Sequence, residues 1–111
     1  MMYKDDRRIF DRFEVDFSAE FKIPAEEESA YAQCRDISAA GVGLLTEERL
    51  VPNRKMEIWL GIPDGREPFR GLAQVIWSKK MQENKWRSGL EFKTVDFMGL
   101  RRIFATLPQR A

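Results

Sequence analysis

Apolar and polar residues alternate over residues 13–23, and this is the clearest local pattern in the chain. One face would carry Phe13, Val15, Phe17, Ala19, Phe21 and Ile23, and the other Glu14, Asp16, Ser18, Glu20 and Lys22. A period of two residues is typical of a β-strand with one buried face. Pro24 ends the pattern, and the polar residues 25–30 predict an exposed loop.

Five further stretches have strand character: residues 31–37, 41–46, 55–62, about 69–80 and 86–92. Pro63-Asp64-Gly65-Arg66 predicts a hairpin turn, since Pro and Asp-Gly favour turn dihedrals. A second turn is expected over residues 81–84. In the stretch 69–80 the alternation places Ala73, Val75 and Trp77 on one face and Leu72 and Ile76 on the other. This strand is therefore expected to be central or strongly curved.

The period changes after Thr94, where apolar residues recur every three or four positions. Phe97, Leu100, Phe104 and Leu107 would form one face of a helix over about residues 96–107. Asp96 is a good N-cap, Pro108 ends the pattern, and Arg101 and Arg102 are expected to be solvated. Six short strands and one terminal helix predict an all-β fold, a small six-stranded antiparallel barrel with one C-terminal α-helix.

Composition narrows the classes of function. The 111 residues are enough for one domain, and 43% of them are apolar. Lys and Arg number 19 against 18 Asp and Glu, so the net charge of +1 provides no field that would attract nucleic acid or an anionic membrane. No apolar stretch has the length of a signal peptide or a membrane span, which predicts a soluble, cytoplasmic protein without a membrane partner.

The sequence offers little for catalysis or for a metal. It contains no histidine, so nothing would activate Ser38 or Cys34 as a nucleophile, and no phosphate-binding glycine loop followed by lysine. Cys34 is the only cysteine and is expected to be a buried core thiol. We therefore predict a protein that is not an enzyme and has no cofactor or metal.

Three arginines precede the first strand, in a charged segment that we expect to be a flexible arm over residues 1–12. Arg7 is followed by Arg8 and Arg12 in the spacing R-x-x-x-R. A guanidinium binds a phosphate, or the O6/N7 edge of guanine, through two parallel hydrogen bonds. Such spacing is also common in solvated tails, so the motif alone leaves both interpretations open.

A second polar motif, Asp36-x-Ser38-x-x-Gly41, lies between two predicted strands. Asp and Ser often close a turn by bonding to the backbone, which is one interpretation. The other is base recognition, because a carboxylate accepts hydrogen bonds from the N1–H and N2–H₂ donors of guanine. Gly41 would then allow the backbone to approach the ligand.

The two motifs, in this order, resemble those of the PilZ domain, the bacterial receptor module for cyclic di-GMP. The resemblance extends over nearly the whole chain, through Gly41-Val42-Gly43-Leu44, Val75-Ile76-Trp77 and Gly89-Leu90-Glu91-Phe92. It implies a six-stranded barrel with a C-terminal helix over residues 13–111, which agrees with the pattern of strands.

The resemblance also implies roles for individual residues. Arg8 and Arg12 would bind phosphates and guanine edges, Asp36 and Ser38 would bind a guanine, and Gly41 would shape the corner. An arginine at the position of Arg7 goes with two stacked cyclic di-GMP molecules in this family. Trp77 either lies beside a bound base or belongs to the core.

The predicted function is a cyclic di-GMP receptor whose N-terminal arm is ordered over the barrel by the ligand, and which passes the signal to an unidentified downstream protein. One alternative is a PilZ-like adaptor that binds protein and no nucleotide. The other is a barrel that binds single-stranded nucleic acid through Trp59 and Trp86, which the near-neutral charge disfavours.

Overall fold

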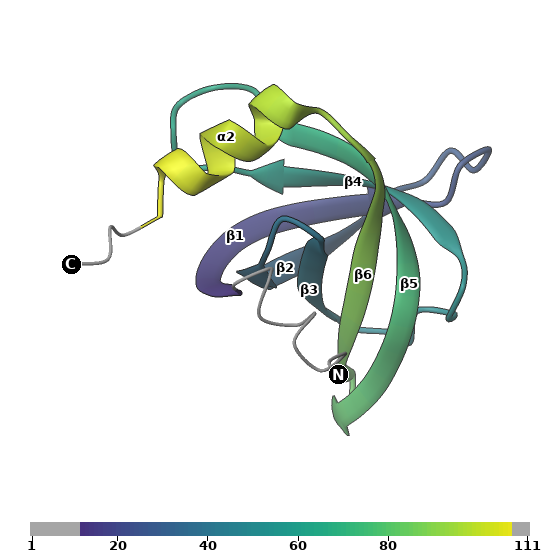
Figure 1. Cartoon of the computed structure of the whole chain (residues 1–111). Coiled ribbons are helices and arrows are strands. Elements are labelled where there is room, and N and C mark those ends of the chain that lie inside the picture. Colours follow the sequence, from purple (N-terminus) through teal and green to yellow (C-terminus); the bar gives the residue numbers. More distant parts are fainter. Residues whose placement is uncertain (1–11, 108–111) are drawn as a thin grey trace, which may run out of the picture.

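Six antiparallel strands close into a barrel that is followed by one helix (Figure 1). The computed structural model describes residues 12–107. The strands are β1 (Phe13–Lys22), β2 (Ala30–Ile37), β3 (Gly41–Thr46), β4 (Lys55–Gly61), β5 (Phe69–Gln82) and β6 (Lys85–Val95), and the helix is α2 (Phe97–Ala105). Around the barrel the order is β1-β2-β3-β6-β5-β4, and β1 closes it by pairing with β4. The predicted fold class is confirmed.

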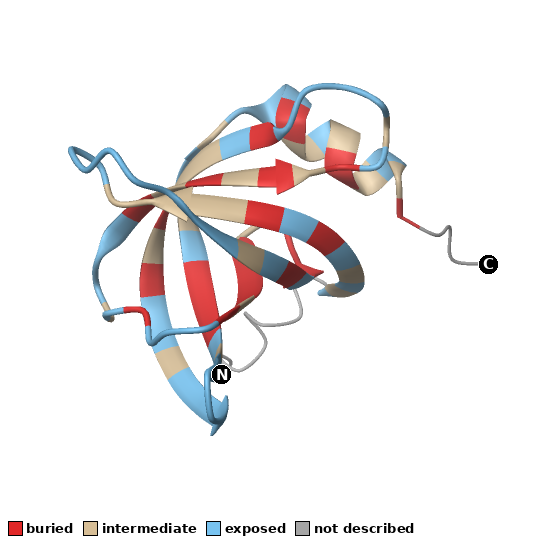
Figure 2. Cartoon of the chain, turned by 180° about the vertical axis from the view of Figure 1, so that it is seen from behind, coloured by how far each residue is buried: buried red, intermediate tan, exposed pale blue. Residues whose placement is uncertain are grey.

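The barrel interior is filled by alternate residues of every strand, visible as repeated buried bands along the ribbons in Figure 2. Leu44, Ile58, Leu60 and Val75 are almost completely buried. In the closed part of the barrel each strand pairs with two neighbours, which satisfies the backbone groups that an open sheet would expose.

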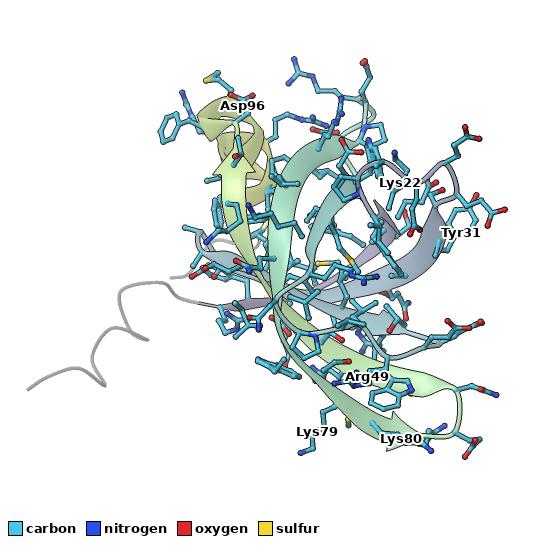
Figure 3. All side chains as sticks on the ribbon, turned by 90° about the vertical axis from the view of Figure 1, so that its right-hand side faces the viewer. Lys22, Tyr31, Arg49, Lys79, Lys80 and Asp96 are labelled. Atoms are coloured by element: carbon cyan, nitrogen blue, oxygen red, sulfur yellow. The ribbon has the colours of Figure 1, made fainter. Side chains whose placement is uncertain are left out.

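Several strand boundaries differ from the predicted ones by one to three residues, and β6 continues to Val95, beyond the predicted residue 92. The strands β5 and β6 continue to Gln82 and Lys85, which pair with each other, so the turn between them is shorter than the predicted 81–84. Asn84 has a φ of 58°, the left-handed conformation that tight hairpin turns use. The resulting hairpin extends beyond the barrel at the end opposite α2, with Lys79 and Lys80 on it (Figures 1 and 3).

The helix begins as predicted and ends two residues earlier. The carboxylate of Asp96, labelled in Figure 3, accepts a hydrogen bond from the Met98 backbone N–H at 3.3 Å. Thr106 ends the helix, because its backbone N–H and its hydroxyl both donate to the Ile103 carbonyl. Ile103 is fully buried in the core, and the Phe104 ring meets Phe13 of β1 edge-on with centroids 5.9 Å apart. The helix therefore covers one end of the barrel.

Arg102 is not solvated, in contrast to the prediction. Its guanidinium donates to both carboxylate oxygens of Asp64, at 2.9 and 3.0 Å, and to the Glu67 carbonyl at 2.6 Å. Asp64 belongs to the turn between β4 and β5, so this contact fastens the helix to that turn. A bidentate pair of this kind needs the planar fork of arginine.

This ion pair makes stability depend on pH. The hydrogen bond from Arg102 lowers the pKa of Asp64 below its ordinary 3.8. A carboxylate with a lower pKa in the folded state stabilises the fold above the unfolded pKa, and that stabilisation is lost as the pH falls through the folded pKa. We expect Arg102→Ala to lower the Tm at pH 7 and to weaken its decline below about pH 4. Thermal unfolding over a pH series measures this, with Arg101→Ala, an exposed arginine one position away, as control; equal effects of the two variants would contradict it.

Candidate functional site

The corner between β2 and β3 is closed by Ser38. The Ser38 Oγ accepts hydrogen bonds from the backbone N–H groups of Ala40 and Gly41, at 3.1 and 3.3 Å, and the Ser38 N–H donates to the Gly41 carbonyl at 2.9 Å. Ser38 is fully buried. Its position therefore supports the interpretation of the serine as a residue that holds the turn, and its hydroxyl does not face solvent.

Asp36 lies on the outer face of the barrel, immediately before this corner. The register between β2 and β3 shifts between Cys34 and Asp36, which marks a bulge. Cys34 and Ile37 point into the core and are fully buried, and the bulge allows Asp36 to point outward between them. The carboxylate is still largely covered, with a side-chain exposure of 12%.

Arg12 reaches this carboxylate because of the register between β1 and β2. Phe13 pairs with Ile37 and Glu14 with Asp36, so the residue before β1 lies beside the corner. The Nη2 of Arg12 lies 3.0 Å from Asp36 Oδ1. This contact is an ion pair without hydrogen-bond alignment, and within residues 12–107 the buried Oδ1 accepts no hydrogen bond. Among residues 12–107 this oxygen is thus held by its ion pair with Arg12 alone.

Arg87 of β6 is the residue of the site that sequence reasoning missed. Its Nη2 donates to Asp36 Oδ2 at 2.7 Å, across 51 positions of sequence. The contact exists because β6 lies next to β3, and no local pattern around Arg87 indicates that pairing. Asp36 therefore lies between two cations, Arg12 and Arg87, whose side chains are 53% and 45% exposed.

Trp77 lies outside the core. The pairing of β5 with β6 shifts between Val75 and Trp77, and this irregularity breaks the alternation that would have placed Trp77 with Ala73 and Val75. Ala73 and Val75 are fully buried, whereas Trp77 is 44% exposed. The prediction of a shared face for these three residues is therefore wrong, for the physical reason that a bulge shifts the period.

Arg12, Gly41 and Trp77 line one shallow hollow of about 170 Å³, together with Ala40, Ile76, Gly89, Leu90 and Glu91. Small-molecule pockets usually have volumes of roughly 300–1,000 Å³. This hollow is smaller, so a nucleotide held there would extend onto the surrounding surface.

Gly41 is required by its neighbour strand. Its φ is not positive, but a Cβ at this position would collide with the carbonyl group of Leu90 on β6, lying 3.0 Å from its carbon. The glycine thus allows β3 and β6 to approach closely at the corner, a structural reason in addition to the expected approach of a ligand.

The family model described as the PilZ domain matches residues 6–105. The chain belongs to the PilZ domain family. No curated protein matches it by sequence.

Solved structures share the PilZ fold at low sequence identity. The inhibitor of motility MotI/DgrA of Bacillus subtilis has a TM-score of 0.73 at 15% identity, over 91% of this chain and 49% of that one. The PilZ domain of Escherichia coli YcgR, solved with c-di-GMP, has a TM-score of 0.70 at 19% identity, over 91% and 88%. K. pneumonia MrkH in its apo state has a TM-score of 0.67 at 20% identity, over 95% and 50%. The chain thus spans about half the length of MotI and MrkH.

Within this PilZ domain the structure places Arg12 beside Asp36, and Arg12, Gly41 and Trp77 around one hollow, whereas Ser38 is buried. Arg7 and Arg8 lie outside the described residues, so their part in the site stays a prediction. The arm over residues 1–12 does too.

Cys34 is a core residue, as predicted. Burial, and secondarily the charge of Asp36, raise the pKa of its thiol to about 12. The thiol therefore stays protonated at neutral pH. Among residues 12–107, no three His, Cys, Asp or Glu side chains are grouped to hold a metal, and no helix is long and apolar enough to cross a membrane.

The two tryptophans considered for nucleic acid binding do not form a common surface. Trp59 pairs with Arg70 and Trp86 with Lys80, so they lie beside positions of β5 that are ten residues apart. The Arg70 guanidinium lies 5.8 Å from the centre of the Trp59 ring and is held by Glu57 at 2.7 Å. Stacking of bases on both rings in succession, the usual way of binding single strands, has no support in this arrangement.

Proposed function

We propose that this PilZ domain is a receptor for cyclic di-GMP, which binds at the β2–β3 corner and is not a substrate. The observation that carries the proposal is the Asp36 carboxylate, which lies between the guanidinium groups of Arg12 and Arg87. Its Oδ1 is 3.0 Å from Arg12 and accepts no aligned hydrogen bond among the described residues. Buried acceptors are normally paired, and an unpaired one is costly. The N1–H and N2–H₂ groups of guanine would donate to this carboxylate as the ligand engages the two arginines.

The remaining parts of the dinucleotide would be bound by cations and by the indole. Arg12 and Arg87 provide two guanidinium groups next to Asp36, and Trp77 offers an exposed ring on the hollow that Arg12 also lines. We infer that Arg8 joins them at the phosphates and guanine edges, and that Arg7 favours two stacked ligand molecules. The small volume of the hollow supports this inference, because residues preceding β1 would have to cover a ligand of this size.

Signalling would follow when the residues preceding β1 cover the bound ligand. Ligand phosphates bridge the arginines of residues 7–12 to the corner and hold that segment against the barrel, which uses part of the gross binding energy for ordering. The surface formed in this way is the one that we expect a downstream protein to bind. The buried free thiol of Cys34 is compatible with a reducing compartment, so we place the receptor in the cytoplasm.

Calorimetric titration tests the proposal directly. We expect cyclic di-GMP to bind with two molecules per chain, and GTP and cyclic GMP to bind far more weakly, because neither presents two guanines on one ring. YcgR, whose PilZ domain is solved with c-di-GMP, serves as the positive control. Equal heats with all three nucleotides, or none with cyclic di-GMP, would refute the receptor proposal. One molecule per chain would refute only the stacked pair.

A further inference from the structure

Four residues from four neighbouring strands form one row across the outer face of the barrel. Asp36 of β2 pairs with Gly43 of β3, Gly43 pairs with Gly89 of β6, and Gly89 pairs with Trp77 of β5. The two central members of the row have no side chain. The Asp36 carboxylate and the Trp77 indole therefore lie on either side of two paired glycines, Gly43 and Gly89.

The side chains of Asp36 and Trp77 each lie over the neighbouring glycine. A Cβ on Gly43 would lie 2.9 Å from the Asp36 Cγ, and a Cβ on Gly89 would lie 2.5 Å from the Trp77 Nε1 and 2.7 Å from its Cε2. Real Cβ atoms essentially never come that close to another heavy atom, so any other residue would displace the carboxylate or the indole. Both glycines are buried although they belong to the outer face, which agrees with their being covered.

We infer that Gly43 and Gly89 are positioning residues of the nucleotide site. They let the Asp36 carboxylate and the Trp77 indole lie against the sheet on opposite sides of the β3–β6 pair. One purine bound between them could then donate to the carboxylate through its edge and contact the indole ring. The inference rests on the proposed cyclic di-GMP function. It assigns to this site two residues outside the arginine and Asp-x-Ser-x-x-Gly motifs.

The contrast with Gly41 distinguishes positioning from support of the fold. A Cβ on Gly41 would meet the backbone of Leu90, which cannot move without disturbing the β3–β6 pairing. The three atoms nearest to a Cβ on Gly43 or on Gly89 all belong to one side chain, that of Asp36 or of Trp77. A side chain can shift without a change in the pairing of the strands. Alanine at Gly43 or Gly89 should therefore impair binding and leave the barrel folded.

The experiment compares Gly43→Ala and Gly89→Ala with Gly71→Ala as the matched control. Gly71 is also on a strand and would gain only ordinary contacts, the nearest being the Thr94 carbonyl oxygen at 3.4 Å. Calorimetry with cyclic di-GMP should show about tenfold weaker binding for Gly43→Ala, about fivefold weaker for Gly89→Ala and no change for Gly71→Ala, since misplacing a contact group costs affinity. Tm values should stay close to that of the unmodified protein.

A double-mutant cycle tests the mechanism itself. If Gly43 acts through Asp36, then Gly43→Ala should cause little further loss of affinity in an Asp36→Ala background, and Gly89→Ala little further loss in a Trp77→Ala background. The indole N–H resonance of Trp77 in the unliganded protein should shift in Gly89→Ala and not in Gly71→Ala.

The outcomes separate this inference from the function on which it rests. Absence of cyclic di-GMP binding by the unmodified protein overturns the receptor proposal. Normal binding by folded Gly43→Ala and Gly89→Ala overturns the positioning role, and so does additive loss in the cycles. Unfolding of either variant also overturns it, because the glycines would then support the strands instead of the two side chains.

Discussion

Replacing Arg12 or Asp36 with alanine is expected to weaken cyclic di-GMP binding at least tenfold while leaving the Tm of the unliganded protein nearly unchanged. A hydrogen bond to a charged group contributes roughly 1.5–3 kcal/mol, and about 1.4 kcal/mol corresponds to a factor of ten in affinity. Asp36→Ala removes the acceptor that we propose for guanine, and Arg12→Ala removes a guanidinium 3.0 Å from it. Calorimetry and thermal unfolding of the same samples measure both effects.

The fold should tolerate these changes because the arginines around Asp36 are half exposed. With side-chain exposures of 53% and 45%, Arg12 and Arg87 can be hydrated when the carboxylate is removed, and exposed ion pairs contribute little to stability. Arg101→Ala, which removes the same charge from an exposed position of the helix, is the control for net charge. A clear fall in Tm for Arg12→Ala and Asp36→Ala, without a specific loss of binding, would show that the ion pairs serve the fold.

The local pattern of apolar and polar residues was sufficient to predict most of the fold, because strands and helices each have a characteristic short-range periodicity. The alternation over residues 13–23 corresponds to β1, and Asp96 caps α2 as expected. The turn at Pro63-Asp64-Gly65-Arg66 joins β4 and β5, with Gly65 at a φ of 74°. Each of these features depends on residues within a few positions of one another.

What local pattern could not predict depends on register between distant strands. Arg87 reaches Asp36, and Gly43 faces Gly89, only because β3 lies beside β6. A bulge, which shifts every following side chain to the other face, moved Trp77 out of the core. Arg102 has the local pattern of a solvated helix residue, and its partner Asp64 comes from the distant turn between β4 and β5.

The motifs alone therefore describe only part of the candidate site. Arg12 and Asp36 could be singled out because their residue types and spacing suit a guanine nucleotide, and the structure brings them to 3.0 Å. Ser38, chosen for the same reason, is buried and holds the turn through its hydroxyl. Two residues of one motif thus have different physical roles, which spacing cannot distinguish.

The second large effect is expected on stability, from Gly41→Ala. The new Cβ would collide with the Leu90 carbonyl group, and both groups belong to paired backbone, Gly41 opposite Glu91 on β6. Relief requires the start of β3 to separate from β6, next to the hydrogen bond from the Phe92 N–H to the Ala40 carbonyl at 2.8 Å. Overpacking of this kind costs about 3 kcal/mol, a large part of the stability of a small domain.

Urea unfolding measures this loss, with Gly71→Ala as the control strand glycine and Gly43→Ala as the comparison two residues away. We expect a much lower urea midpoint for Gly41→Ala and near-normal midpoints for the other two variants. A Cβ would collide with backbone at Gly41 and with a side chain at Gly43, and at Gly71 it would make only ordinary contacts. The result would be contradicted by a stable Gly41→Ala protein that has lost only nucleotide binding. In that case the corner glycine would serve the ligand directly, and β6 would have to yield to a Cβ that its present position excludes.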